Sequence, residues 1–270
     1  MAQIATQIEK MASQSCEQLS LLRYRLSPAD VFKSVGPKLV PFLKTFCVYF
    51  VAWLPESSKP TVFAAIIKIL PILCLCGFVM LQGISMQKDH DYSRRILIGL
   101  IFSAVGDICL VWKHQLFIHG MAAFAIAHLA YMRAFGFQPL KPLTGMICFF
   151  IMLPTYHLYF PNLKGILAIA VPVYIVIIGI MLWRAISGLQ AQLLSDDGLW
   201  RWTKLCACLG ALSFGISDAV IGFNMFYFPV QYSRFIVMTT YYAGQLGIAL
   251  STFSLDDENN LRMKSNMKHE

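Results

Sequence analysis

The sequence has 270 residues, of which 57% are apolar, while Lys, Arg, Asp and Glu together supply only 13%. Charged residues make up about a quarter of an ordinary soluble domain, so this composition excludes one. The sequence has 22 Lys and Arg against 14 Asp and Glu, and this basic balance is typical of a membrane protein with basic cytoplasmic loops. A nucleic-acid binder is excluded because no basic stripe interleaved with aromatic residues is present.

Charge-free apolar runs predict membrane-spanning helices, because an unpaired charge at bilayer depth is costly and charged residues therefore flank the spans. We expect eight spans, which in chain order are 39–54, 61–82, 94–112, 116–136, 143–160, 165–183, 203–224 and 234–254. The first is short and carries Pro41 and Lys44 in its first turns. The connections leave no room for an extramembrane catalytic domain. The expected fold is an all-α polytopic membrane protein whose chemistry lies among the helices.

The spans divide the chain into three regions. Residues 1–36 form a flexible cytoplasmic arm without the apolar core of a signal peptide, 37–255 form the transmembrane catalytic domain, and 256–270 form a polar cytoplasmic tail. With the N-terminus in the cytoplasm, sixteen Lys and Arg fall on the cytoplasmic side and four on the other side. This bias predicts that both termini are cytoplasmic.

The eight cysteines do not indicate a disulfide framework or a metal site. Seven of them fall inside predicted spans, where we interpret them as small apolar packing residues. The sequence contains no Cys-x-x-Cys pair, and the two Cys-x-Cys pairs point to different faces of their helices.

Two aspartates are the most informative residues. Of the 14 acidic residues, only Asp107 and Asp218 lie within predicted spans, and a carboxyl group at that depth is a functional candidate by default. The alternative is a structural role, as a helix-packing hydrogen bond or an ion pair with Lys68. Gly99 and Gly210 each precede one of the aspartates by eight residues in a stretch rich in small residues. This equivalence between spans three and seven raises the hypothesis of a four-plus-four duplication.

Other polar residues in the spans lie at compatible positions, although each also suits an ordinary interhelical hydrogen bond. They are Ser103, His128, Tyr131, Tyr241, Tyr242 and Gln245. Lys68 differs, because a lysine inside a span must either extend to the interface or meet an anion. That anion would be a substrate phosphate or one of the aspartates.

Five segments occur in a specific order: Lys68-Ile-Leu-Pro71, Phe102-Ser-Ala-Val-Gly106-Asp107 with Leu110, His128-Leu-Ala-Tyr131, Phe214-Gly-Ile-Ser217-Asp218 and Tyr241-Tyr242-Ala-Gly-Gln245. Together they resemble the lysoplasmalogenase (YhhN-like) family of integral-membrane hydrolases, in particular its animal branch. The resemblance runs from about Gly36 to Phe253 and leaves the N-terminal arm outside.

This resemblance implies an enzyme of the endoplasmic reticulum that cleaves the vinyl ether bond of lysoplasmalogens to a fatty aldehyde and glycerophosphoethanolamine or glycerophosphocholine. The reaction needs one acid and one base, and Asp107 and Asp218 can fill the two roles in either order. Ser217 joins the six polar residues above as an expected pocket residue, and Lys68 is expected to attract the phosphate. The expected partners are the lipid substrate and membrane lipids, with no metal, cofactor or nucleic acid; the oligomeric state stays open.

Two other functions compete with this hydrolase. A proton-coupled transporter also uses intramembrane carboxylates, but the sequence has no matched Gly or Pro interruptions in its two halves. A zinc-dependent lipid hydrolase would combine His128 with the aspartates, and it needs at least three converging ligands. His119 and His157 are predicted at the outer boundary, away from His128.

Overall fold

The structure is a computed structural model that describes residues 28–52, 60–82, 90–193 and 198–253. Most of the predicted N-terminal arm and all of the predicted polar tail lie outside the described residues. The chain divides into two units, residues 1–36 and 37–270. Of the first unit, the structure describes only the helical segment 28–36.

All regular secondary structure among the described residues is helical, as the sequence predicted. They form α2 (Pro28–Ala52), α3 (Val62–Met80), α4 (Asp91–Val111), α5 (Lys113–Phe135), α6 (Pro142–Tyr159), a short 3-10 turn η2 (Phe160–Asn162), α7 (Leu167–Gln192), α8 (Gly198–Phe226) and α9 (Ser233–Leu250). Each predicted span corresponds to one helix. The largest differences are at α2, which begins earlier than predicted, and at α7, which continues well past the predicted end at Trp183.

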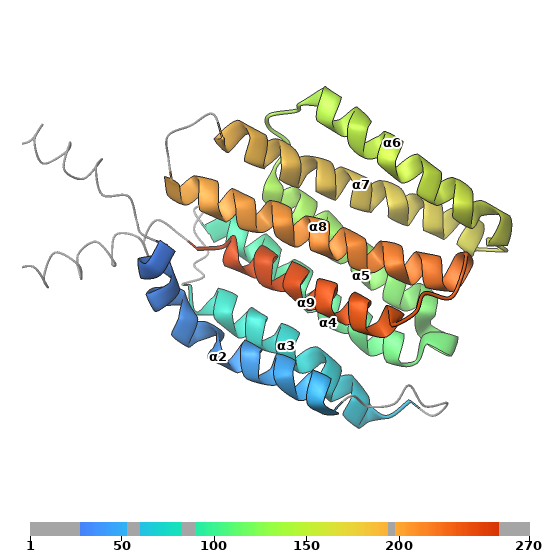
Figure 1. The fold of residues 1–270 in the computed structure, drawn as a ribbon, viewed down its shortest axis with the longest axis horizontal. Helices are drawn as coiled ribbons and strands as arrows, with labels where there is room; N and C mark the ends of the chain where they lie inside the picture. The colour runs from blue at the N-terminus through green and yellow to red at the C-terminus, as the bar shows by residue number, and fades with distance from the viewer. Residues whose placement is uncertain (1–27, 53–59, 83–89, 194–197, 254–270) are drawn as a thin grey trace, which may run out of the picture. The chain divides into compact units, whose positions relative to one another are not determined.

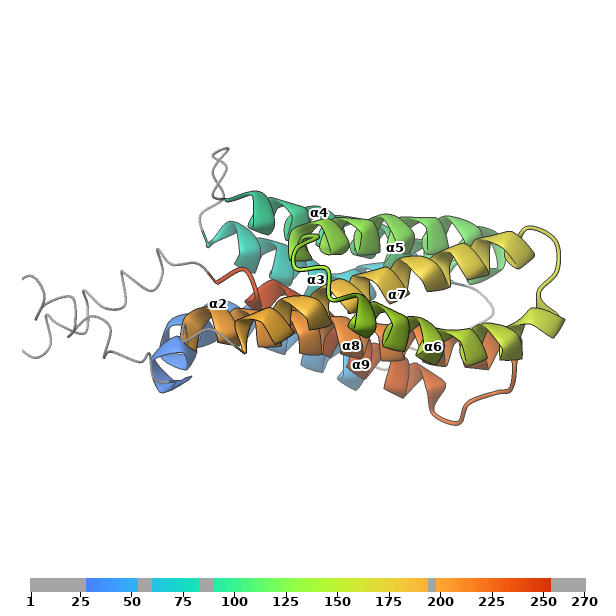
Figure 2. The same ribbon diagram turned by 90° about the horizontal axis from the view of Figure 1, so that it is seen from above.

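Six helices of the second unit form a closed ring in which each helix contacts the next. The order around this ring is α3, α4, α5, α7, α8, α9 and back to α3. Figures 1 and 2 show α4 and α5 on one side of the ring and α8 and α9 on the other, while α6 lies outside it against α7. The α2 residues from Pro37 onward contact α9 through Phe46 and Tyr49, whose rings meet the Tyr242 ring.

Large apolar side chains cover much of the outer surface, and several polar side chains are buried among apolar ones inside the ring. Ser103, His128 and Gln245 are fully buried, whereas Phe150 is 63% exposed and Ile169 is 71% exposed. Large apolar residues on the outer surface are stable when lipid covers them. The protein is therefore an integral membrane protein.

Six described helices are long and apolar enough to cross a membrane: α2, α3, α5, α6, α7 and α8. The other two long helices are α4 and α9. α4 carries Asp91, Arg94 and Arg95 in its first turns and Asp107 further along, and α9 carries Tyr241 and its polar neighbours. These two helices are less apolar because of their charged and polar residues, of which Asp107, Tyr241 and Gln245 are buried inside the ring.

The extension of α7 has a local cause. Arg184 is fully buried, and its guanidinium donates hydrogen bonds to the backbone oxygens of Gly136 at 2.6 Å and Pro139 at 2.9 Å. The neighbouring Trp183 indole donates to the Lys141 oxygen at 3.0 Å. These bonds satisfy the carbonyl groups of the loop between α5 and α6. Arg184 can therefore lie inside α7, although a charged residue in the sequence indicates the end of a span.

The contact between α8 and α9 depends on glycine. A Cβ on Gly210 would lie 2.7 Å from the Ile248 backbone nitrogen and 2.8 Å from the Gly244 backbone oxygen. Small residues let helix backbones approach closely in membranes, where packing replaces the hydrophobic effect as the driving force. The small residues that the sequence places before Asp218 therefore have the close-packing role expected of them.

We expect Gly210→Ala to lower the melting temperature of the purified protein by about 3–10 °C, because the backbone of α9 cannot move away from the added methyl without repacking. Gly77→Ala is the matched control, since no atom lies within 4 Å of a Cβ at that position. Equal melting temperatures for the two variants would contradict this account of the α8–α9 contact.

Candidate functional site

Asp107 lies on α4 with both of its carboxylate oxygens bonded. The Lys68 ammonium on α3 lies 3.1 Å from Oδ1, and the Tyr241 hydroxyl on α9 donates a hydrogen bond of 2.6 Å to Oδ2. The carboxylate side chain is 3% exposed, and that of Lys68 is 15% exposed. A buried carboxylate is stable only when it is paired and hydrogen-bonded, and these two partners meet that requirement.

Asp218 lies on α8 and has different partners. The His128 Nε2 on α5 and the Tyr174 hydroxyl on α7 both lie 3.0 Å from its Oδ2, and they lie 3.2 Å from each other. The Asp218 side chain is 11% exposed, more than that of Asp107. His128 is charged only when protonated, so Asp218 shares its site with a group that can either carry or release a proton.

The partners of the two aspartates come from corresponding helices. Each carboxylate receives one partner from the preceding helix, α3 or α7. The second partner comes from the helix that follows the other aspartate in the chain. Asp107 therefore receives it from α9, and Asp218 receives it from α5. The Phe214 ring stands between the two groups, with its centroid 4.6 Å from that of His128 and 5.3 Å from that of Tyr241.

A third set of predicted residues meets one turn away from the aspartates. The Tyr131 hydroxyl donates to the Gln245 side-chain oxygen at 2.8 Å, and the Ser103 hydroxyl lies 3.5 Å from that of Tyr131. All three side chains are buried. The sequence grouped these residues with the carboxylates, whereas in the structure they bond to one another.

Two further predicted residues hold helices together. The Tyr242 hydroxyl donates to the Lys68 backbone oxygen at 2.7 Å, and the Ser217 hydroxyl donates to the Val237 backbone oxygen at 3.1 Å. Their hydrogen bonds go to backbone oxygens rather than to a carboxylate. Tyr242 thereby fixes the position of the helix that carries Lys68, and Ser217 ties α8 to α9.

Sequence reasoning missed Tyr174. It is the only hydroxyl-bearing residue in the apolar run of α7 from 167 to 183. A lone polar residue in an otherwise apolar span is a usable signal, but it is weak because tyrosine is also common in membrane helices without a site role. Phe214 was part of the resemblance, but its place between the two aspartate groups follows only from the packing.

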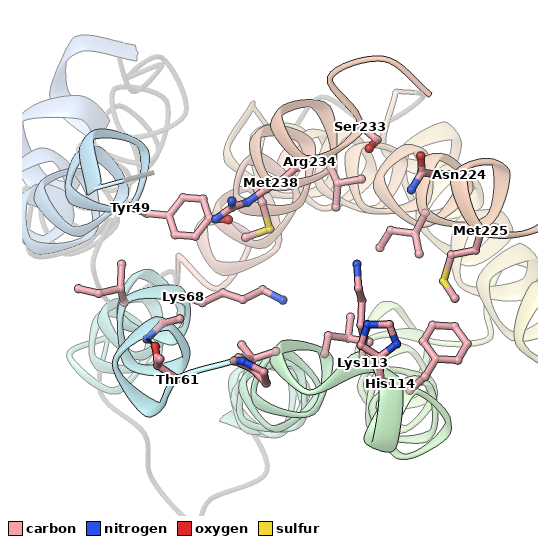
Figure 3. Close-up of a pocket in the computed structure, with 18 residues that line it drawn as sticks. Tyr49, Thr61, Lys68, Lys113, His114, Asn224, Met225, Ser233, Arg234 and Met238 are labelled. Carbon is pink, nitrogen blue, oxygen red and sulfur yellow. Dashed lines mark hydrogen bonds between the residues drawn. The ribbon is translucent and has the colours of Figure 1, made fainter. Parts of the chain in front are cut away.

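A pocket of about 720 Å³ opens at the end of the ring that holds the α4–α5 turn and the α8–α9 loop. Figure 3 shows the amino groups of Lys68 and Lys113 reaching into this pocket. Lys68 belongs to both places, since it lines the pocket and contacts Asp107. The volume lies within the usual range for small-molecule sites, about 300–1,000 Å³.

The described residues contain no group of three His, Cys, Asp or Glu side chains placed to hold a metal ion. The seven cysteines among them are free thiols, and all seven lie within helices. The site places Asp218 beside a histidine and a tyrosine, and it places Asp107 beside a lysine that also lines the pocket.

Comparison with known proteins shows the family of the chain. The YhhN family model matches residues 63–252. The chain is 48% identical to "Lysoplasmalogenase TMEM86A" from Bos taurus and from Homo sapiens, over 84% of this chain and 92% of each relative. It is 40% identical to "Lysoplasmalogenase TMEM86B" from Homo sapiens, over 79% of this chain and 85% of the relative. No solved structure matches. The chain belongs to the YhhN family, in the animal branch of these lysoplasmalogenases.

Proposed function

We propose that the protein is a lysoplasmalogenase that hydrolyses the vinyl ether bond of lysoplasmenylethanolamine and lysoplasmenylcholine within the membrane. The products are a fatty aldehyde and glycerophosphoethanolamine or glycerophosphocholine. The observation that carries the proposal is the pair of buried carboxylates with unlike partners, in a chain 48% identical to a relative of that name.

The reaction needs a proton donor and a group that accepts a proton from water. A proton first adds to the vinyl ether carbon that does not bear oxygen, which leaves an oxocarbenium ion at the other carbon. Water attacks this ion and loses its proton to the base, which gives a hemiacetal. The hemiacetal then breaks its bond to the glycerol oxygen, which takes up the hydroxyl proton, and the aldehyde is released. Glycosidases divide the same work between two carboxyl groups.

We assign the acid role to Asp218 and the base role to Asp107. Lys68 lies 3.1 Å from Asp107 and favours its ionised form, which is the form that can stabilise the oxocarbenium ion and accept a proton from water. Asp218 instead faces His128, whose Nδ1 is buried and without a hydrogen-bond partner among the described residues. A carboxyl and an imidazole at 3.0 Å can hold one transferable proton between them.

The remaining site residues support this chemistry. We propose that Tyr241 and Tyr174 orient the two carboxylates by their hydrogen bonds. Gln245 has a buried Nε2 with no partner among the described residues, so its amide can donate to water or to the glycerol hydroxyl. Tyr131 holds the Gln245 oxygen and thereby directs that amide.

The finer topology is part of the same proposal. We propose that all eight long helices cross the membrane, including α4 and α9, because the polar groups of these two helices face the inside of the ring. Sixteen of the 22 Lys and Arg then lie on the cytoplasmic side together with both termini, and the membrane is that of the endoplasmic reticulum.

Asp107→Asn and Asp218→Asn should each reduce aldehyde release from lysoplasmenylethanolamine by at least about a hundredfold, because an amide neither donates the catalytic proton nor accepts one from water. Asp91→Asn is the matched control, since Asp91 lies on the same helix as Asp107 and pairs with Arg94 and Arg95 instead. Activity near wild type in either site variant would remove that aspartate from the mechanism.

Lys68→Met should lower kcat by about tenfold to a hundredfold, because Asp107 loses its compensating charge. The sequence alone also allowed Lys68 to bind the substrate phosphate. In that case the substitution would raise KM and leave kcat unchanged. Lys44→Met, which removes another lysine from a predicted span, should change neither constant. A variant with altered KM and unchanged kcat would return Lys68 to substrate binding.

Chelators should leave aldehyde release by the purified protein unchanged, because the proposed steps use only side chains and water. Loss of activity with chelator and its return with zinc would support the zinc-dependent hydrolase instead. Folded wild-type protein that releases no aldehyde from any lysoplasmalogen would make a proton-coupled transporter the better hypothesis.

A further inference from the structure

The two aspartates lie much closer to one end of the ring than to the other. Asp107 lies four residues before the end of α4 and sixteen residues after its start, which correspond to about 6 Å and about 24 Å along the helix axis. Asp218 lies eight residues before the end of α8 and twenty residues after its start, or about 12 Å and about 30 Å. Both carboxylates are therefore near the end of the ring at which α4 and α8 end, which is the end that holds the pocket.

The pocket extends from that end toward the carboxylates. Its lining residues Leu110 and Ile221 follow Asp107 and Asp218 by three residues, which is about one helical turn. Concave space with polar lining groups can hold water. Figure 3 shows polar side chains from three helix ends around this pocket, among them Thr61, Asn224 and Ser233. Water in the pocket thus comes within about one turn of both aspartates.

The opposite end of the ring, where α9 ends, is filled with apolar side chains (Figure 1). Ile96 on α4, Met181 on α7 and Ile248 on α9 lie between the aspartates and this end, and none of them has exposed surface. The hydroxyl groups of Tyr92 and Ser251 lie 2.7 Å apart and join the start of α4 to the end of α9. Closely packed apolar regions stay dry. The described side chains at this end therefore separate the carboxylates from the aqueous phase there.

We infer that the site exchanges water and its water-soluble product through the pocket alone, at the membrane face opposite to the one on which α9 ends. The inference rests on the proposed function and assigns a side to that reaction. Glycerophosphoethanolamine and glycerophosphocholine carry charges that oppose passage through a bilayer core, so the product stays on the face where it is released. Under the topology proposed above, that face is the lumenal one. A reaction that consumes the product by hydrolysing its phosphodiester must act on this face or follow a transport step.

The depth of the site also selects the leaflet that supplies the substrate. The vinyl ether of a lysoplasmalogen is bonded to the glycerol, so it lies just below the headgroup region of its own leaflet. The apolar core of a bilayer is about 30 Å thick, and Asp107 is only about 6 Å from the pocket end of its helix. A lipid of the leaflet on the pocket side therefore presents its vinyl ether at the level of the carboxylates. A lipid of the other leaflet would have to carry its charged headgroup most of the way across the ring.

Sealed phosphatidylcholine vesicles that hold single molecules of the full-length protein separate the two faces. A C-terminal tag captures the vesicles in which α9 ends outside, and those that remain have the pocket outside. Lysoplasmenylcholine labelled in its choline is then added to the medium. Vesicles with the pocket outside should release labelled glycerophosphocholine into the medium at least about tenfold faster than captured vesicles, because the charged headgroup crosses the bilayer slowly. Opening the vesicles with detergent should make the two rates equal.

Equal rates before detergent would overturn the inference, and so would product that collects inside the vesicles whose pocket faces outward. An absence of hydrolysis in both populations, even in detergent, would contradict the proposed function instead. Access through the pocket then has to be measured without catalysis.

Thiol labelling supplies that measurement. Ile221→Cys places a thiol in the pocket lining, and a membrane-impermeant maleimide should label it above the wild-type background only in vesicles with the pocket outside. Ile248→Cys is the matched control, because the same substitution in the apolar end of the ring should stay unlabelled in both populations. Labelling of either variant from the face on which α9 ends would overturn the inference. No labelling of Ile221→Cys from the pocket face would overturn it as well.

Discussion

Two carboxylates buried within a ring of apolar helices impose the main constraint on this structure. Each must be matched by proton donors, because the surrounding lipid and apolar side chains supply none. The donors come from four helices other than those of the aspartates, so all six helices of the ring must be held at fixed separations. Tyr242 and Ser217 fix some of these separations through backbone carbonyls, and the glycine contact between α8 and α9 fixes another.

The two halves of the ring place proton donors beside their aspartates with the same geometry but with different residues. Lys68 and Tyr174 occupy corresponding helices, and so do Tyr241 and His128. The four-plus-four duplication that the sequence suggested would produce this correspondence, with α2 and α6 as the two outer helices, and it stays a prediction. Under the proposed function, this chemical difference separates the two catalytic roles, because one aspartate lies beside a lysine and the other beside a histidine.

The fold was largely predictable from the sequence, since charged residues interrupt the apolar runs at nearly every helix end. Arg184 shows the limit of that rule, because a buried arginine that binds loop carbonyls looks like an end signal in a sequence. Asp107 and Asp218 stand out in the sequence because a buried charge is costly. His128 and Tyr241 could be predicted because each has a second polar residue three or four positions later on the same helix face. Which donor serves which carboxylate, and the part played by Tyr174, depend on helix rotation and on contacts between residues far apart in the chain. Sequence periodicity does not determine these.

The Phe214 ring between the two aspartate groups has a consequence for the return to the starting state. Under the proposed division of roles, one turnover leaves Asp218 without its proton and Asp107 with one more. A phenyl ring carries no group that can relay a proton, so the hydrogen cannot return straight through it. The proton must return to Asp218 around the phenyl ring, by way of water molecules. The pocket beside Lys68 lies next to Asp107 and can admit that water. Under the proposed mechanism, each turnover therefore depends on water that enters this pocket as well as on the carboxylates.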